Sequence, residues 1–430
     1  QNFTTATDSF NTAVGYNAGY SVTTGVQNTL IGAQVGDALT DADFNTAIGY
    51  LALSADTLGS KSTAIGYAAL KDQNFTTATD SFNVAVGHLA GENVTTGVEN
   101  TLLGSQSGKS LTDADYNVAV GHNALTSDTK GSRAIAIGRH ALETQNFTTA
   151  TANYNIGIGY NAGRLITTAV QNVLIGGLTG DAITTGNNNT AVGNFALGAN
   201  QTGAQNTAVG VQALTAATGN DNVAVGMNAG LAITSGTRNT IVGALAGDTF
   251  DTGTENTVIG YSANTGGGAS TRQVVIGSNV TAAGNNAVRI GTSVGTATLE
   301  LDGSDTSWAA ASDERLKKDI ADSTVGLSFI NALRPVTFKW NAKDAIADTL
   351  PQYDADSSDP VYGEGKAHHG FIAQEMKAAI DARSDIVDGH NLWRQDPDGT
   401  QQVAPAALIP MLVKAIQELS AEIETLKSGG

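Results

Sequence analysis

Cysteine is absent from this 430-residue chain, which excludes disulfide bridges, thiolate metal sites and a cysteine nucleophile together. Proline is scarce, since all six prolines lie after residue 311. No apolar run approaches the ~18 residues that a membrane-spanning helix needs, so membrane insertion is not expected. Basic residues are also few, and no cluster of Lys and Arg is present that would bind a phosphate backbone. With a net charge of −18, the chain is not expected to bind nucleic acid.

Charged residues are distributed unevenly along the chain. Residues 1–311 contain 10 Lys/Arg and 21 Asp/Glu, whereas residues 312–430 contain 12 and 19 in a much shorter segment. A single hydrophobic core does not change its surface chemistry so sharply, so we expect two domains with a boundary just before Ser312. The chain begins at Gln1 without a methionine or a signal peptide, and we expect it to be a fragment of a longer protein.

A short apolar segment that ends in glycine recurs throughout the first domain. It is NTAVG at residues 11–15, NTLIG at 28–32 and NTAIG at 45–49, and it continues to residue 291. Most repeats are 17 residues long, but the steps from Gly66 to Gly87 and from Gly138 to Gly159 are 21. Such a period is typical of a solenoid, in which each repeat forms one coil.

The longer steps reveal a second level of repetition. The motif QNFTTAT begins at Gln1, Gln73 and Gln145, which are 72 residues apart. We therefore expect an inserted loop on the same face of the solenoid at every fourth coil.

The apolar pentads are too short for helices, and their alternation predicts β-strands. A glycine after each strand permits the positive φ of a tight corner. One coil cannot bury its own apolar face, so stacked coils must supply the core. In stacked coils, the recurring asparagines four residues before the glycines would bond neighbouring backbone in a ladder. These asparagines are Asn11, Asn28, Asn45, Asn83, Asn100, Asn117, Asn155, Asn172, Asn189, Asn206, Asn222, Asn239 and Asn256.

These repeats resemble the head repeats of trimeric autotransporter adhesins, which have similar NSVAIG-like pentads and a somewhat shorter period. The resemblance implies a parallel β-roll or β-solenoid within a homotrimer. Repeat-rich fibres of this composition also occur among bacteriophage tail proteins. The expected fold is therefore mostly β, with a shaft of 17-residue coils over residues 1–311.

Two kinds of side chain in the shaft suggest ligands. Acidic loop clusters could bind Ca²⁺ through several oxygens or could be solvated loop charges, and we favour the second interpretation. They comprise Asp37, Asp41, Asp43, Asp113 and Asp115. Aromatic residues near the 21-residue steps could offer sugar-stacking surfaces or could pack beneath the loops, and we favour packing. They are Phe3, Phe10, Phe75, Phe82, Phe147 and Tyr154. No cofactor or metal site is predicted.

The second domain, residues 312–430, lacks the repeats of the first and has a different pattern of apolar and charged residues. We expect a short helix from Ser323 to Leu333 with serine as its N-cap, and a strand from Val336 to Trp340. The segment GFIAQEMKAAI, residues 370–380, indicates a strand end followed by a helix. The last segment predicts a long amphipathic helix. Its apolar residues Ile409, Leu412, Ile416, Leu419, Ile423 and Leu426 are spaced 3, 4, 3, 4, 3, which is a coiled-coil seam.

The motifs SDERLKKDI, PVTFKW, GFIAQE and IPMLVKAIQEL resemble the intramolecular chaperone domain of endosialidase-type tailspikes. That domain also occurs in many phage fibres and in a eukaryotic membrane-bound transcription factor. The resemblance implies a small α+β domain that trimerises, folds the upstream shaft and then releases itself with a serine–lysine dyad. In a parallel coiled coil, Ile at a with Leu at d favours two strands, so the trimer rests on the resemblance.

The resemblance assigns catalytic roles to particular residues. The matching positions are Ser312 as nucleophile and Lys317 as general base, and the cleaved bond would be Ala311–Ser312. Asp313 and Arg315 match the motif with a structural role, and His368 matches a position of catalytic support or interface packing. A serine needs a base to take its proton, and a lysine becomes such a base only when burial lowers its pKa. We therefore expect the dyad to form only in the assembled trimer.

These observations favour a trimeric phage tail fibre or adhesin that binds a glycan or protein receptor on the host cell surface. Its location would be the virion tail or another extracellular surface. Its only enzymatic activity would be one autoproteolytic cut. Two alternatives remain open at this point. One is a tailspike that degrades a polysaccharide, and the other is a bacterial adhesin or filament that uses the same chaperone.

Overall fold

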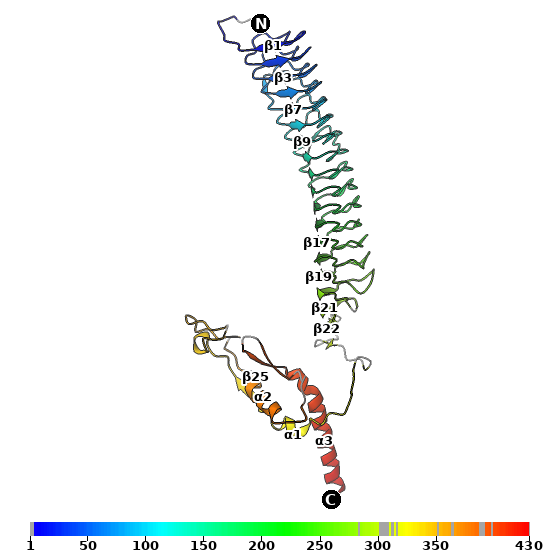
Figure 1. Cartoon of the computed structure of the whole chain (residues 1–430), viewed down its shortest axis with the longest axis vertical. Helices are drawn as coiled ribbons and strands as arrows, with labels where there is room; N and C mark the ends of the chain where they lie inside the picture. The colour runs from blue at the N-terminus through cyan, green and yellow to red at the C-terminus, as the bar shows by residue number, and fades with distance from the viewer. Residues whose placement is uncertain are drawn as a thin grey trace. The chain divides into compact units, whose positions relative to one another are not determined.

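In the computed structural model, residues 4–282, 284–300, 309–310, 314, 317–350, 352–362, 365–386, 392–396 and 399–429 are described. The chain divides into two compact units, Gln1–Ala311 and Ser312–Gly430. The first unit is a β-solenoid of about 16 coils, which confirms the mostly β fold. Figure 1 shows its coils stacked one on another from blue to green.

Each coil of the solenoid contributes one short strand to a long parallel sheet. Successive strands pair in register one coil apart, so that Thr12 of β1 faces Thr29 of β2 and Thr101 of β8 faces Val118 of β9. These strands are β1 (Thr12–Val14), β2 (Thr29–Ile31), β3 (Thr46–Ile48), β5 (Thr63–Ile65), β7 (Val84–Val86), β8 (Thr101–Leu103), β9 (Val118–Val120), β11 (Ile135–Ile137), β13 (Ile156–Ile158), β14 (Val173–Ile175), β15 (Thr190–Val192), β16 (Thr207–Val209), β17 (Val223–Val225), β18 (Thr240–Val242), β19 (Thr257–Ile259), β20 (Val274–Ser278) and β21 (Ala287–Thr292).

The last strands of the sheet reverse direction. Strand β21 pairs antiparallel with β22 (Gly295–Glu300), and β22 pairs antiparallel with β23 (Ala309–Ala310). The regular stacking of coils therefore ends at β21.

The predicted asparagine ladder is present and is buried. Asn100 is fully buried, and its Oδ1 accepts the backbone N–H of Asn117 at 3.0 Å. Its side-chain amide donates to the carbonyl of Ala114 at 2.8 Å. The same pair of bonds recurs at Asn189 and Asn222. Each asparagine thus satisfies buried backbone groups in two places, which is what stacked coils require.

The glycine that ends each strand allows the coils to stack closely. Gly104 has a φ of +134°, and a Cβ built on it would lie 2.6 Å from the carbonyl oxygen of Gly121 in the next coil. The position therefore excludes a side chain both by backbone conformation and by space.

Large and small residues alternate in the core. From β2 to β19 of the main sheet, the central residue of each strand is buried, as Leu30 and Leu102 are. A Cβ built on Gly36 would lie 3.0 Å from Leu30 Cδ2, so the leucine fills the space that this glycine leaves. In the next coil a small strand residue, Ala47, is matched by a large one, Leu53, and both are fully buried. A single chain therefore closes its own shaft core at close packing.

The two inserted loops form short parallel strand pairs beside the main sheet. Strand β4 (Gly59–Ser60) pairs with β6 (Thr79–Asp80), and β10 (Gly131–Ser132) pairs with β12 (Thr151–Ala152). The two pairs are 72 residues apart, as the higher-order repeat predicts.

The second unit is a small α+β fold with its own core. Strand β24 (Val336–Phe338) pairs antiparallel with β25 (His368–Gly370), and β26 (Trp393–Gln395) pairs with β27 (Gln401–Val403). The helical elements are α1 (Leu327–Ile330), α2 (Ala373–Asp381), α3 (Ile409–Ser428) and the 3₁₀ turns η2 (Lys343–Ala345) and η3 (Pro405–Leu408). Their shared core contains Val325, Phe329, Met376, Ile380, Leu392 and Leu408.

Two local predictions in this unit were wrong in their bounds. The first helix begins at Leu327 rather than at Ser323, and it is only one turn long. Its first N–H groups are not capped by a nearby serine, because the Glu418 carboxylate of α3 accepts the N–H of Leu327 at 2.7 Å. Strand β24 ends at Phe338, two residues before Trp340.

Candidate functional site

Most of the residues predicted for self-cleavage lie outside the described residues. These are Ala311, Ser312, Asp313 and Arg315. Lys317 is described, and its side chain is exposed in the single chain. Its backbone N–H donates to the carbonyl of Glu314 at 3.0 Å. The serine–lysine dyad therefore stays a prediction.

His368 lies on strand β25 within an aromatic cluster. Its ring centroid is 5.7 Å from that of Phe338 and 6.4 Å from that of Trp340. Trp340 also contacts Tyr362 edge to face, at 4.9 Å between centroids. Nε2 of His368 is buried and has no hydrogen-bond partner among the described residues. The cluster gives His368 a packing role on this strand pair.

An open depression of about 690 Å³ adjoins this aromatic cluster. Its lining includes Trp340, Tyr362, Phe371, Gln402 and Pro405. Gln402 lies on β27 and Pro405 begins η3, whereas Trp340, Tyr362 and Phe371 lie outside the strands. Sequence reasoning did not predict the depression, because its walls come from segments far apart in the chain.

Helix α3 leaves its predicted seam open to solvent. Ile416 is 62% exposed and Leu419 is 43% exposed, and the other seam residues are exposed as well. An adjacent side of the helix packs on its own domain through Ala415 and Glu418. The heptad pattern therefore does not serve the core of the single chain, and an apolar stripe of this length marks an interaction surface.

The aromatic residues of the shaft divide into two groups. Phe75 and Phe147 are buried beneath the inserted loops, as the packing interpretation expected. Phe82 and Tyr154 are instead 50% and 52% exposed, and Phe10 is 71% exposed. Phe3 lies outside the described residues. Packing thus explains only part of the aromatic content of these loops.

The acidic loop residues form local hydrogen bonds. Asp43 Oδ1 accepts the N–H of Val26 at 2.7 Å, and Asp115 Oδ1 accepts the N–H of Val98 at 2.8 Å. Asp113 lies 3.5 Å from the ammonium group of Lys130. Within the described ranges, no group of three His, Asp or Glu side chains is arranged to hold a metal ion.

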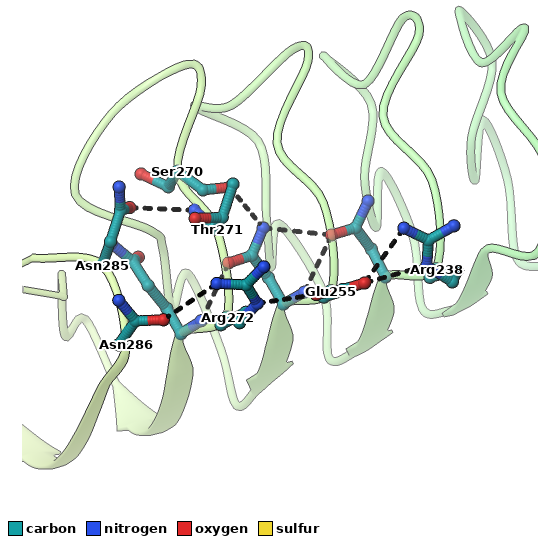
Figure 2. Close-up of polar contacts among 10 residues, drawn as sticks. Arg238, Glu255, Ser270, Thr271, Arg272, Asn285 and Asn286 are labelled. Atoms are coloured by element: carbon teal, nitrogen blue, oxygen red, sulfur yellow. Dashed lines mark hydrogen bonds and ion pairs between the residues drawn. The ribbon is translucent and has the colours of Figure 1, made fainter. Parts of the chain in front are cut away.

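Near its C-terminal end, the shaft carries an exposed ionic ladder. Glu255 lies between two guanidinium groups, with Arg238 Nη2 at 2.9 Å and Arg272 Nε at 2.9 Å (Figure 2). Both arginines lower the pKa of the Glu255 carboxyl, and Arg272 has the larger effect. Figure 2 shows the three side chains along one corner of successive coils, with Asn286 beyond Arg272.

One comparison with known families gives a match. Residues 312–383 match the model of the peptidase S74 family, which is described as the chaperone of endosialidase. That description implies a peptidase-related, autoproteolytic chaperone domain. No curated protein and no solved structure matches the chain. A β-solenoid followed by such a segment fits a protein of the phage tail-fibre or tailspike type and suggests an extracellular fibre.

In the described part of the chain, no helix is both long enough and apolar enough to cross a membrane.

Proposed function

We propose that this chain is the distal part of a homotrimeric tail fibre or adhesin that binds a receptor on a host cell surface. Residues 312–430 act as an intramolecular chaperone that aligns three chains and then cuts itself from the shaft. One observation carries the proposal: the family match begins at Ser312, the residue at which the second compact unit begins. A cut there separates the two units without breaking either core.

Self-association is supported by the seam on α3. The heptad spacing of the seam requires a helix with the same repeat, and a copy of this chain provides one. The shaft offers a second repeating surface, since the last strand residue of each coil points outward and is Val or Ile in most coils. Val14, Ile31, Val86, Ile137, Ile175, Val225, Val242 and Ile259 are 36–58% exposed. Three copies in register would cover this row along the whole shaft.

The cleavage follows from simple acyl chemistry. The hydroxyl oxygen of Ser312 attacks the carbonyl carbon of Ala311, and Lys317 takes the hydroxyl proton. The peptide C–N bond breaks, and the proton goes to the departing α-amino group of Ser312. Water then hydrolyses the ester, which restores the serine hydroxyl and leaves a carboxylate on Ala311.

Cleavage is coupled to assembly through the lysine. Lys317 is exposed in the single chain. Burial of this amine between copies would lower its pKa and make it a base. The chain therefore cuts only after the three copies have met.

Denaturing electrophoresis with intact-mass measurement tests the proposal. Unmutated protein should give two fragments, one ending at Ala311 and one starting at Ser312. Ser312→Ala and Lys317→Arg should each give one uncut chain, because the first lacks the nucleophile and the second cannot lose its proton. Lys318→Ala, which changes the neighbouring exposed lysine, should be cut normally. Uncut unmutated protein in a trimeric sample would contradict the proposed cleavage.

A further inference from the structure

One corner of the shaft carries aromatic side chains at every second coil. Each coil has one position, four residues before the glycine that ends its strand, that asparagine occupies in most coils. The residue immediately before this position lies at a corner with positive φ. These corner residues lie above one another because the coils stack in register. We call this row the corner column. From the N-terminus it reads Phe10, Gln27, Phe44, Lys61, Phe82, Glu99, Tyr116, Arg133, Tyr154 and Gln171. Aromatic and polar residues therefore alternate strictly over ten coils.

Backbone contacts hold the corner column in line. The N–H of Phe44 donates to the carbonyl of Val26 in the coil before, and the N–H of Lys61 donates to Asp43 in the same way. The N–H groups of Tyr116 and Arg133 repeat the pattern further along the shaft. The column is thus a rigid part of the solenoid.

The rings of the column are exposed, and cations between them contact three of the four. Phe44, Phe82, Tyr116 and Tyr154 are 44–52% exposed. The Lys61 ammonium lies 5.2 Å from the centre of the Phe82 ring, and the Arg133 guanidinium lies 5.2 Å and 5.8 Å from the rings of Tyr116 and Tyr154. Cation–π contacts of this kind orient a ring without covering all of it. Exposed aromatic rings at a fixed spacing mark a binding surface.

The spacing of the rings fits a linear polysaccharide. Adjacent strands of a sheet are ~4.8 Å apart, so rings on alternate coils recur every ~9.6 Å. This is about the length that two linked pyranose units span in an extended chain. The C–H face of a pyranose is apolar and packs on an aromatic ring, while its hydroxyl edges need hydrogen-bonding groups. Gln27, Lys61, Glu99 and Arg133 are exposed between the rings and supply such groups.

Charge favours a neutral polysaccharide over an anionic one. Residues 1–311 contain 21 acidic and 10 basic residues, so the shaft repels polyanions over its length. The two basic residues of this part of the column, Lys61 and Arg133, are balanced by Glu99 in the column and by Asp80, the ion-pair partner of Lys61. This part of the column therefore has no net positive charge to attract carboxylate or sulfate groups.

A second copy of the chain explains the corner column less well. A copy would contact every coil, as the outward Val and Ile row requires, whereas the rings occur at alternate coils and stop at Tyr154. Further along, the same corner carries Asn188, Gln205, Asp221 and the ionic ladder Arg238, Glu255 and Arg272. The occupant therefore has a two-coil repeat and uses only the first half of the shaft.

We propose that the corner column from Phe44 to Tyr154 binds a neutral polysaccharide whose sugar rings stack on the four aromatic side chains. The proposal rests on the proposed receptor-binding function, and it names the ligand class and the site. Because binding is spread over several rings, affinity should rise with oligosaccharide length until all four rings are covered.

The test uses the full chain and a fourfold variant, Phe44→Asn, Phe82→Asn, Tyr116→Asn and Tyr154→Asn. Asparagine suits this backbone, because Asn188 occupies the same column at a φ of +58°. The probes are immobilised glucans, galactans, mannans and neutral bacterial O-polysaccharides, with hyaluronate and polysialate as anionic polymers. We expect binding to at least one neutral polymer, and the fourfold variant should weaken it by at least about tenfold.

The matched control is Phe195→Asn. Phe195 is also exposed and also has a positive φ of +58°, but it lies at another corner, which holds asparagine in other coils, for example Asn161. The control should bind like the unmutated chain. The proposal is overturned if no neutral polymer binds, if only the anionic polymers bind, or if the fourfold variant binds normally.

Two further measurements separate this proposal from the proposed function. If the fourfold variant loses its oligomeric state, the column is a contact between copies and the polysaccharide site is wrong. If the variant still attaches to host cells like the unmutated chain, receptor binding stands and the assigned site fails. If neither protein attaches to any cell tested, the receptor-binding function itself fails.

Discussion

The side-chain amide of Gln73 donates a hydrogen bond of 2.7 Å to the carboxylate of Asp56, inside the shaft. Both residues are fully buried. The equivalent residues 72 positions later, Gln145 and Asp128, form the same bond at 2.6 Å. Oδ1 of Asp56 also accepts the N–H groups of Gly59 and Phe75, so the carboxylate ties the inserted loop to the coil below it.

Burial makes these carboxylates sensitive to pH. Loss of hydration raises the pKa of Asp56 and of Asp128, against the lowering effect of their hydrogen bonds. A raised folded pKa means that the folded chain binds protons more readily than the unfolded one. Stability from this source is fully present below the unfolded pKa of 3.8 and is lost as pH rises through the folded value. Asp56→Asn removes the titrating group and keeps one side-chain oxygen that can accept the N–H groups of Gly59 and Phe75.

Melting temperatures followed by circular dichroism between pH 3.5 and 7.5 check this expectation. The unmutated chain should gain stability relative to Asp56→Asn as pH falls from neutral toward 3.8. Asp221→Asn removes one carboxylate at an exposed corner and serves as the control for the change in net charge. Parallel curves for the unmutated chain and Asp56→Asn would contradict a raised pKa at this site.

The asparagine ladder should be a large source of shaft stability. Asn100→Ala removes the acceptor of the Asn117 N–H and the donor to the Ala114 carbonyl, and it leaves both groups buried. Each lost bond costs about 1–3 kcal/mol, so the variant should lose roughly 2–6 kcal/mol of unfolding free energy. Denaturant unfolding measures the difference.

The structure supplies a second test of the ladder at a place where it is interrupted. Ala134 occupies a ladder position without a side-chain amide, and there Asn153 Oδ1 accepts the N–H of Asn155 at 2.9 Å instead. Asn153→Ala should therefore destabilise the shaft, although Asn153 lies outside the 17-residue pattern. Asn146→Ala changes an exposed residue of the same loop and should cost less than about 0.5 kcal/mol. Equal effects of the two variants would argue against a stabilising role for the bond from the Asn155 N–H to Asn153.

The repeating parts of the fold could be predicted from the sequence because the same residue types make the same contacts in each coil. The ladder at Asn100 and the corner at Gly104 follow from spacing alone, and both predictions are confirmed. The Asp56–Gln73 pair could not be predicted, since it depends on which side of an inserted loop turns inward. The exposure of Phe82 beside the burial of Phe75 has the same cause.

The second domain shows the limit of local patterns in a fold without repeats. Ser323 has the sequence signature of an N-cap, but Glu418, 91 residues from Leu327 in the chain, provides the bond. Of the candidate cleavage site, only Lys317 is among the described residues, so its dyad with Ser312 stays a prediction.

The glycines that end the strands of the shaft should tolerate no side chain. Gly104→Ala places a methyl group 2.6 Å from the carbonyl oxygen of Gly121 and forces an alanine into a φ of +134°. The two coils must separate, so we expect a loss of about 3 kcal/mol or more, or failure to fold. Gly295→Ala is the control, because a Cβ built there meets nothing within 4 Å. A stable Gly104→Ala protein with an unchanged melting temperature would mean that the coils stack less closely than described.

The open seam on α3 gives a direct test of self-association. Ile416→Lys and Leu419→Lys together place two charges on a stripe that is exposed in the single chain, so the fold of each copy should survive. In an assembly the same two charges would be buried among apolar side chains, which costs several kcal/mol unless the helices separate. Sedimentation analysis should therefore show trimers for the unmutated chain and smaller species for the double variant.

Because the proposed cleavage needs assembled copies, the double variant should also remain uncut. Gln417→Lys adds the same kind of charge one residue away from the seam and should leave both assembly and cleavage intact. A trimeric double variant would show that the three copies are held by the shaft and that the heptad pattern has another use.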